Sequence, residues 1–557
     1  MRIASLFAVV VLSSLALRAQ ELTGALPMSV RLGLDRAVVR TLEAAAFNEE
    51  ATATDDAQRD AQGKLPLYAR FVALDATLPA SGTWTELAGG DRVWRLRVAS
   101  PGAQATELFF EDSHLPAGAQ VHVYDDGGEQ LLGGYTSAHV QADGTLSTGM
   151  ILGDACTIEY HEPAAVRGEG SLHLVRIAHA YRHVLQEKSD DCEVDVVCSE
   201  GANWTNERNS VVRIRVIVPS GAGFCTGVLM NNTANDCKGY ILTAFHCTAE
   251  SVSANFGSYV FRFRHERTEC GTMNATGNDL TGCVFRAGSQ DGGDTFPGGQ
   301  YGSDYTLLET TAPIPASYSP YWAGWDINAT GAASGVCIHH PAGDVKKIST
   351  FSSQASSTSW SGFTSGSHWQ VTWVATANGH GVTEPGSSGA PIFNPLKRVV
   401  GTLTGGLSCC VVNDCGDFTG PTAPDKFGKM GYHWWENNPN ATEEELHWWL
   451  APVNNPEYQN GSADPCGAIG MDEFDLLLPE VFPNPASDHI TLRLPGAWQN
   501  AERIHVTDVT GRVVHSEQLN GSASLLLHAA AWGTGSYFIT VFIEGRIPVS
   551  VRVSVVN

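Results

Sequence analysis

The chain has 557 residues, with 34 Lys+Arg against 59 Asp+Glu, and its formal net charge is −25. This acidic balance argues against a broad grip on nucleic-acid phosphates. With 43% apolar and 17% charged residues, neither a disordered chain nor a coiled coil fits. At roughly 150 residues per domain, the length predicts three or four domains, and the 58 Gly and 26 Pro indicate turn-rich, mostly β material.

The first segment of the chain is typical of an export signal. Met1-Arg2 forms a short basic region, residues 3–17 are largely apolar, and Ala19 is a small residue suited to signal-peptidase cleavage. We therefore expect residues 1–20 to be a signal peptide and the protein to be secreted via the periplasm. No later apolar run reaches about 18 residues, so we expect no membrane span.

The cysteine usage agrees with export. Only Cys156 precedes residue 190, and the other twelve of the 13 cysteines lie between Cys192 and Cys466. Outside the cytoplasm such cysteines indicate disulfides rather than metal ligands. The cysteine cluster near residue 410 lacks the paired C-x2-C and histidine pair of a zinc site. We expect disulfides, no metal and no cofactor.

The region before residue 190 divides into two parts. Residues 21–66 are rich in Ala, Asp and Thr without a sustained period, which predicts a loosely ordered lead-in. From residue 67 to about 180, alternating segments at 94–98, 121–124 and 172–175 are separated by Gly/Asp/Pro turns and predict a β-sandwich. The polar stretch 186–191 is typical of an exposed boundary.

The region from about 192 to 466 is also rich in predicted strands. They cover residues 211–218, 259–263, 369–374 and 398–403, and a capping box with an acidic first turn predicts one late helix over 442–450. Many short strands with one closing helix favour an antiparallel barrel or sandwich over a parallel α/β sheet.

Three separate segments of this region carry residues suited to nucleophilic catalysis. His246 ends an apolar strand, Asp304 precedes another, and Ser388 lies in the glycine-rich run Gly386-Ser-Ser-Gly-Ala-Pro. A serine hydroxyl attacks well only when an imidazole takes its proton, and a carboxylate must orient that imidazole. The N–H groups of Gly386 and Ser388 could then form an oxyanion hole, where one donor is typically worth about 3 kcal/mol of barrier.

These motifs resemble a known family. The order His246, Asp304, Ser388, with Thr-Ala-x-His-Cys and Gly-x-Ser-Gly-x-Pro, resembles the chymotrypsin-fold serine proteases. Within that group, residues 192–451 resemble the bacterial lysyl endopeptidases in the segments 231–236, 303–309, 322–326, 338–341, 381–389 and 397–401. The resemblance implies a double β-barrel with the three residues between the barrels.

The resemblance also implies disulfides and a substrate pocket. The implied pairs are Cys192 with Cys410 or its neighbour Cys409, Cys410 being the better match, Cys198 with Cys270, and Cys225 with Cys247. Asp425 matches the acid at the base of the lysine pocket, while the usual trypsin position six residues before Ser388 holds Val382. Trp360 matches a substrate-binding tryptophan, but the histidine that it stacks on in the family is replaced by Thr404.

A buried carboxylate such as Asp425 has a physical preference among substrates. In a narrow apolar slot it would select a compact ammonium on a long apolar stem over the wide fork of arginine. We therefore expect cleavage after lysine. A same-fold protease of glutamyl or broad specificity remains an alternative, as does a catalytically inactive adhesin or binding protein.

The family pattern further implies a precursor. Self-cleavage after Lys188 would make Ser189 the new N-terminus and release residues 21–188 as a pro-region, leaving residues 189–470 as the protease domain. Ser387 stands where trypsin relatives carry an acid, so the usual pairing of a new N-terminus with that acid is not available.

The C-terminal residues 474–557 form a fourth region. Their segments alternate apolar and polar residues around Gly turns, which predicts a small β-sandwich, and they resemble type IX secretion sorting domains. A carbohydrate-binding or adhesive module is the alternative. The expected partners are protein or peptide substrates and the secretion machinery, with no nucleic acid, and we expect a monomer.

Overall fold

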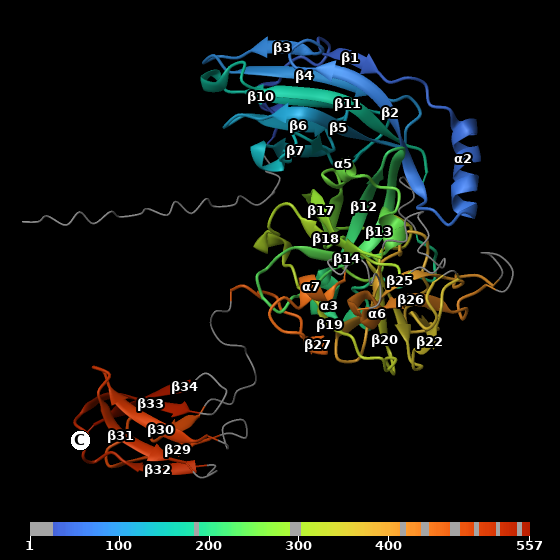
Figure 1. Ribbon diagram of the computed structural model, residues 1–557. Helices are drawn as coiled ribbons and strands as arrows, with labels where there is room; N and C mark the ends of the chain where they lie inside the picture. Colours follow the sequence, from blue (N-terminus) through green and yellow to red (C-terminus); the bar gives the residue numbers. More distant parts are fainter. Residues whose placement is uncertain are drawn as a thin grey trace, which may run out of the picture. The chain divides into compact units, whose positions relative to one another are not determined.

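The computed structural model describes residues 26–182, 189–289, 302–361, 363–412, 419–435, 445–467, 479–494, 501–519, 524–542 and 549–556. The chain separates into two compact units, Met1–Cys466 and Gly467–Asn557 (Figure 1). Most of the described secondary structure is strand, which confirms the predicted fold class. The expected signal peptide, residues 1–20, and Lys188 lie outside the described residues.

The N-terminal part of the first unit is a two-layer β-sandwich. One sheet has the order β1-β4-β10-β6-β7 with β3 on β4, and the other layer contains β2-β11-β5-β8 with β9 on β5. Trp94, Phe110, Ile158 and Ile177 belong to the buried cluster between the layers. The elements are α1 (Met28–Leu32), β1 (Arg40–Glu43), α2 (Glu49–Ala61), β2 (Leu67–Thr77), β3 (Thr83–Glu86), β4 (Arg92–Ala99), β5 (Ala105–His114), β6 (Gln120–Tyr124), β7 (Leu131–Tyr135), β8 (Leu146–Ser147), β9 (Ile151–Leu152), β10 (Ala155–Glu162) and β11 (Ser171–Ala180).

One expectation for this part is wrong, because the supposed loose lead-in contains the helix α2. The Asn48 side chain accepts a hydrogen bond from the N–H of Ala51 and so caps the helix. Glu49 and Glu50 occupy the first turn, where their negative charges interact favourably with the positive end of the helix dipole. The buried side chains of α2 are the polar residues Asp56 and Arg59. The helix therefore lacks the apolar stripe by which a sequence pattern reveals a helix.

Two largely antiparallel sheets follow, one for each barrel of the fold; β19 and β25 of the second sheet pair in parallel. The first joins β16-β15-β12-β13, continues through β14 to β18, and ends on β17; the second has the order β21-β20-β24-β25-β26-β23-β22, with β19 on β25 and β27 on β19. The elements are α3 (Thr205–Ser210), β12 (Val211–Val218), β13 (Gly221–Leu229), β14 (Tyr240–Thr243), α4 (Phe245–Thr248), α5 (Ser253–Phe256), β15 (Val260–Phe263), β16 (Asn278–Thr281), β17 (Cys283–Gly288), β18 (Thr306–Thr310), β19 (Gly324–Asp326), β20 (Gly335–His339), β21 (Lys347–Phe351), β22 (Ser356–Thr358), β23 (His368–Val371), β24 (Pro391–Phe393), β25 (Arg398–Gly406), β26 (Asp425–Lys429), α6 (Met430–Trp435), α7 (His447–Leu450) and β27 (Tyr458–Gln459).

The sandwich and the first barrel share one sheet. β2 pairs antiparallel with β13, with Ala69 opposite Ala222, and Figure 1 shows β2 descending from the sandwich toward β13. A buried ion pair crosses the same boundary, where a guanidinium nitrogen of Arg215 lies 2.8 Å from a carboxylate oxygen of Glu107. The junction is therefore an integral part of the first unit rather than a loose contact.

The second unit is a small β-sandwich of two sheets, as its alternating pattern predicts. The sheets have the orders β28-β29-β32 and β31-β30-β33-β34, and Ile490, Ile504, Trp532 and Ile539 belong to its buried core. The strands are β28 (Glu480–Phe482), β29 (His489–Arg493), β30 (Arg503–Asp508), β31 (Val513–Gln518), β32 (Ser524–His528), β33 (Gly535–Phe542) and β34 (Val549–Val555). Among the described residues of the whole chain, every helix is too short or too polar to cross a bilayer.

Candidate active site

His246 and Asp304 meet because the strands next to them are paired. β14 runs antiparallel to β18 with Thr243 opposite Thr306, so the end of one strand lies beside the start of the other. His246 follows β14 in α4, and Asp304 precedes β18. Nδ1 of His246 lies 2.9 Å from Oδ2 of Asp304, and the backbone N–H of His246 donates to Oδ1 at 3.0 Å.

The carboxylate of Asp304 is held in one position and in its charged form. Its side chain is 1% exposed, and its backbone adopts the left-handed region with φ at 62°. Burial opposes ionisation, but the charge and hydrogen bonds of His246 and a hydrogen bond with Thr404 lower the pKa of Asp304 to about 2. Conversely, burial lowers the pKa of His246, but the Asp304 carboxylate raises it above its ordinary value.

Ser388 lies in the loop before β24 and packs against the segment that carries His246. The Ser388 carbonyl accepts a hydrogen bond from the N–H of Thr226 at 2.9 Å and lies 3.8 Å from Sγ of Cys247. At Gly389 an added Cβ would approach the Ala244 nitrogen to 2.6 Å, so only glycine fits. The structure therefore brings the loops of all three predicted residues together between the two barrels.

The turn before Ser388 is built for glycine and exposes backbone donors. Gly386 has φ at 98°, and a Cβ there would lie 2.8 Å from the Gly343 nitrogen and 2.9 Å from the His340 oxygen. The N–H groups of Gly386 and Ser388 donate to no protein group within the described residues. Two unsatisfied donors beside a serine are suited to receive an oxyanion.

A second layer of polar side chains supports Asp304, and the sequence patterns did not reveal it. The Thr404 hydroxyl, which bonds Asp304, also lies 3.0 Å from Nε2 of His368. Burial lowers the pKa of His368 to about 4, so this imidazole is neutral at neutral pH. Thr404, which replaces the histidine of the family pattern, thus holds the Asp304 carboxylate.

His433 forms a parallel contact with the residue before Asp304. Its Nδ1 lies 2.6 Å from the Ser303 hydroxyl, and its Nε2 lies 3.0 Å from the Thr402 hydroxyl. Burial lowers the pKa of His433 to about 3. The contacts of His368 with Thr404 and of His433 with Ser303 and Thr402 have no local sequence signal, because each joins residues more than 30 positions apart.

Asp425 is completely buried at the start of β26. Its Oδ2 accepts hydrogen bonds from Nε1 of Trp373 at 2.6 Å and from the hydroxyls of Thr383 and Ser408 at 2.7 and 2.6 Å, and Oδ1 accepts from the Ser408 N–H at 3.1 Å. No lysine, arginine or histidine in the described part of the chain pairs with it. Burial raises its pKa despite these donors.

Three consecutive residues of β25, from Thr404 to Gly406, lie next to Asp304, Trp360 and Asp425 in turn. Thr404 bonds Asp304; a Cβ on Gly405 would lie 2.9 Å from the Trp360 ring; and Gly406 faces Asp425 across the sheet. Trp360 therefore lies beside the stretch of β25 that leads from Thr404 to Gly406.

The cysteines form four disulfides among the described residues. The three pairs implied by the family resemblance are present, and a fourth joins Cys237 to Cys466, for which the sequence suggested no partner; the bonds are Cys192–Cys410, Cys198–Cys270, Cys225–Cys247 and Cys237–Cys466. Cys225–Cys247 fixes β13 to the helical turn that holds His246. Cys156, Cys283 and Cys337 are buried thiols, and Cys415 lies outside the described residues.

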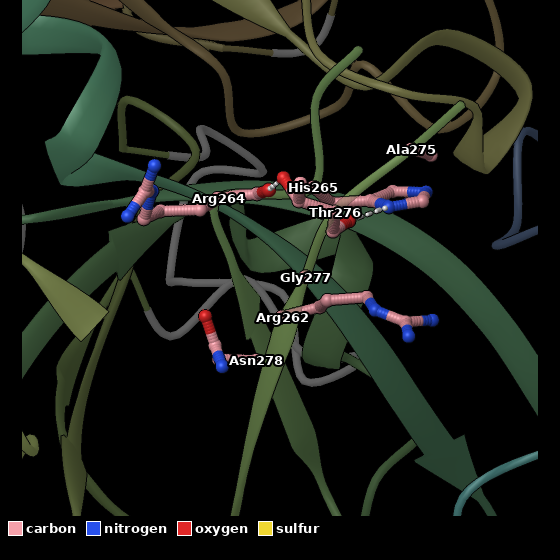
Figure 2. A pocket seen from close by; sticks show the side chains of 7 residues that line it. All are labelled: Arg262, Arg264, His265, Ala275, Thr276, Gly277 and Asn278. Atoms are coloured by element: carbon pink, nitrogen blue, oxygen red, sulfur yellow. Dashed lines mark hydrogen bonds between the residues drawn. The ribbon is translucent and has the colours of Figure 1, made fainter. Parts of the chain in front are cut away.

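Two clusters of possible metal ligands and one cavity stand out among the described residues. Two clusters combine cysteine with carboxylates, Cys237 with Asp464 and Cys466, and Asp190 with Glu384 and Cys410, but their sulfurs are in disulfides and cannot bind as thiolates. A cavity of about 530 Å³ is lined by Arg262, Arg264, His265, Ala275, Thr276, Gly277 and Asn278. Figure 2 shows its two arginine side chains pointing in opposite directions, so they do not converge on one ligand.

Comparison with known proteins identifies the family. The profile described as "Lysyl endopeptidase, C-terminal domain" matches residues 186–419, and the profile described as "Lysyl endopeptidase N-terminal domain" matches residues 18–181. The chain belongs to the lysyl endopeptidase family. A third profile, "Secretion system C-terminal sorting domain", matches residues 480–552 of this family member.

Individual relatives are more distant. The lysyl endopeptidase of Pseudomonas aeruginosa is 25% identical over 362 residues, which cover 59% of this chain and 71% of that protein. Among solved structures, the thermostable serine protease AL20 of an extremophilic microorganism shares 12% identity with a TM-score of 0.27, covering 40% of this chain and 92% of its own. Protease Anisep of Arthrobacter nicotinovorans shares 15% with a TM-score of 0.28, covering 40% and 91%.

These matches settle the coarse function of this lysyl endopeptidase family member. It is a serine endopeptidase that acts on peptides or proteins, and it is secreted with a type IX sorting domain at its C-terminal end. The predicted family and enzyme class are confirmed.

Proposed function

We propose that the protein hydrolyses peptide bonds on the carboxyl side of lysine, with His246, Asp304 and Ser388 as the catalytic triad. The observation that supports this most is the 2.9 Å contact between Nδ1 of His246 and Asp304, with the Ser388 loop packed against the same turn. A bond on Nδ1 leaves Nε2 as the basic nitrogen, which is the tautomer that a general base requires.

In this proposal the reaction has two steps. His246 takes the Ser388 proton as the hydroxyl attacks the scissile carbonyl, and the same imidazolium then protonates the leaving amine. Water repeats the sequence on the acyl-enzyme. Gly386 and Ser388 donate N–H groups to the oxyanion, while the ionised Asp304 stabilises the transient charge on His246.

Lysine specificity is proposed from the surroundings of Asp425. Its oxygens accept only neutral donors in the described structure, so an incoming ammonium would be its first ion-pair partner. A buried carboxylate without a cation is costly, which favours a substrate that supplies one. A glutamate side chain would be repelled here, and this argues against glutamyl specificity.

A digestion experiment tests the proposal. The purified protein is incubated with a peptide pool that carries each residue at the cleavage position, and the products are sequenced by mass spectrometry. Cleavage after lysine supports the proposal, whereas equal cleavage after many residues supports the broad alternative. Covalent labelling of Ser388 by an organophosphate eliminates the adhesin alternative, since that reaction needs an activated serine.

The histidine–carboxylate pair predicts a pH dependence. The general base must be neutral, and Asp304 raises the pKa of His246 above 6.5. We expect kcat/KM to fall as the pH drops through a midpoint above 6.5, because protonation removes the base. A pH profile with a small lysine ester measures this, and Asp304→Asn should lower the activity about 10⁴-fold. A flat profile down to pH 5 would contradict the assigned role of His246.

Maturation is proposed to follow the predicted boundaries. Residues 1–20 would leave as the signal peptide, 21–188 as the pro-region after cleavage behind Lys188, and 474–557 as the sorting domain after export. The protease domain would then extend from 189 to 470 and act as a monomer. N-terminal sequencing of the active enzyme tests the boundary at Ser189.

A further inference from the structure

Ser189 is buried against a carboxylate, which an ordinary linker residue would not be. Its backbone N–H lies 3.2 Å from Oδ2 of Asp344, and its hydroxyl lies 2.9 Å from the same oxygen. Ser189 is 6% exposed and Asp344 is 1% exposed. The N–H that becomes an amine when the chain is cut at this residue is therefore already directed at a negative charge.

The residues just after Ser189 are also bonded to the segment that leads to Ser388. The N–H of Asp190 donates to a Glu384 carboxylate oxygen at 2.9 Å, the Cys192 carbonyl accepts from His380 and Gly381, and Cys192 is bonded to Cys410. The start of the proposed mature enzyme is thus fixed on both sides of the segment that leads to Ser388.

The charges around Asp344 favour an additional cation. Lys347 Nζ lies 3.6 Å from Asp344 Oδ2 but only 2.7 Å from Asp195, and Arg267 is 3.9 Å from Asp344 Oδ1. Glu384 and Asp190 add negative charge nearby. Burial is the main cause that raises the pKa of Glu384 to about 7, and the charges of Asp190 and Asp344 add to it.

Two further titratable groups, Glu193 and His340, bear on the charge near the Ser189–Asp344 contact. Burial, with the charge of Glu384 adding to it, raises the pKa of Glu193 well above its ordinary value. Nδ1 of His340 donates to the Asp344 carbonyl at 2.9 Å, and burial keeps the pKa of this imidazole well below its ordinary range. His340 is therefore neutral and does not compete as a cation.

The Asp344 loop is in direct contact with the proposed oxyanion turn. The N–H of Ala342 donates to the Pro385 carbonyl at 2.7 Å, and Ala342 holds a left-handed backbone with φ at 52°. Gly386 fits so tightly that a Cβ would lie within 3.1 Å of the Ala342 nitrogen. A non-glycine residue keeps this conformation only when its surroundings enforce it, and Asp344 belongs to the same turn, since its N–H donates to the Pro341 carbonyl at 2.8 Å.

We propose that Asp344 is the binding site for the α-ammonium group of a mature enzyme that begins at Ser189, and that this ion pair positions the Gly386 turn. The inference rests on the proposed maturation behind Lys188. Hydrolysis breaks the C–N bond of that peptide; water supplies the hydroxyl of the new carboxylic acid and a proton to the amine, after which the acid releases its proton to solvent and the amine takes one up. One N–H donor thereby becomes a charged group with three. Asp344 is a positioning residue that acts through the loop 340–344.

The test compares the processed wild type with Asp344→Asn, after N-terminal sequencing shows that both begin at Ser189. We expect kcat to fall about 10- to 100-fold with little change in KM, a smaller loss than removal of a whole oxyanion donor causes. A free α-amine titrates near 7.7–8.0, and a carboxylate partner raises this value. The activity of the wild type should therefore fall at alkaline pH, with a midpoint above about 8, as the α-ammonium group loses its proton. We call this fall the alkaline limb of the pH profile, and Asp344→Asn should lack it. The separate loss of activity caused by deprotonation of the substrate lysine, whose ordinary pKa is about 10.4, should remain in both proteins.

Two further variants keep the test valid if Asp344→Asn folds poorly. Inserting one glycine between Lys188 and Ser189 leaves every side chain in place but moves the amine by about one residue, roughly 3.5 Å, and it should remove the same limb. Asp326→Asn is the matched control, since this nearly buried acid faces Arg398 at 3.8 Å rather than Ser189 or Lys347, and it should keep the alkaline loss of activity.

The outcomes separate this inference from the proposed function. If Asp344→Asn and the glycine insertion both retain the wild-type kcat and alkaline limb, or if the active enzyme begins elsewhere than at Ser189, the inference is overturned while lysine cleavage and Ser388 labelling stand. If the processed wild type shows no lysine cleavage, the proposed function fails, and N-terminal sequencing still reports the processing site.

Discussion

Ser388→Ala is expected to lower kcat by about a millionfold, the size of loss seen when a triad serine is removed. The reason is that no other hydroxyl in the loop can take its place beside His246. The neighbouring Ser387 is directed at Nδ1 of His339, at 2.8 Å. Single-turnover cleavage of a lysine ester by purified protein measures the effect, and the precursor should remain uncut behind Lys188 because self-cleavage is lost.

Ser387→Ala is the matched control for this experiment. It removes two hydrogen bonds of the Ser387 hydroxyl, one with His339 and one from the Glu384 N–H, each worth about 1 kcal/mol of stability, and it should leave ester cleavage and organophosphate labelling in place. Substantial activity in folded Ser388→Ala, or labelling at a different serine, would show that the nucleophile has been assigned wrongly.

Asp425→Asn is expected to reduce kcat/KM for lysine substrates about 100- to 1,000-fold. The substrate ammonium would then be buried without a counter-charge, and removing one partner of a buried ion pair typically costs 3–5 kcal/mol. Substrates with an uncharged residue before the scissile bond should be cleaved as by the wild type. Kinetics on a matched series of peptides that differ only at this residue provide the measurement.

Asp326→Asn serves as the comparison for Asp425→Asn. Asp326 is another nearly buried carboxylate at the end of a barrel strand, and it faces Arg398 at 3.8 Å rather than a pocket. The Asp326→Asn variant should be less stable than the wild type but should keep the preference for lysine. Unchanged lysine preference in folded Asp425→Asn would move the specificity site to another acid.

The local patterns were sufficient for much of the fold. Strands such as β12, over residues 211–218, and the sandwich of the C-terminal unit have strict alternation or long apolar runs that only an extended backbone can bury. The three catalytic candidates were found because glycine-rich and His-Cys motifs surround them. Their proximity could be expected only through the family resemblance.

What the sequence did not predict depends on contacts between distant residues. The pairing of β2 with β13 joins two edge strands about 150 residues apart, and the Arg215–Glu107 ion pair across it leaves no trace in either local pattern. The same holds for Thr404 and His368, which become partners only after the strands are placed. Helix α2 was missed because its buried side chains are polar.

The disulfide between Cys237 and Cys466 has a mechanical consequence for export. Cys466 is the last residue of the first unit, and its bond reaches back 229 positions to the first barrel. Because β27 (Tyr458–Gln459) precedes Cys466, a force applied to the chain beyond residue 466 would load this disulfide before it reaches β27. The bond closes residues 237–466 into a covalent loop that does not depend on the chain beyond residue 466.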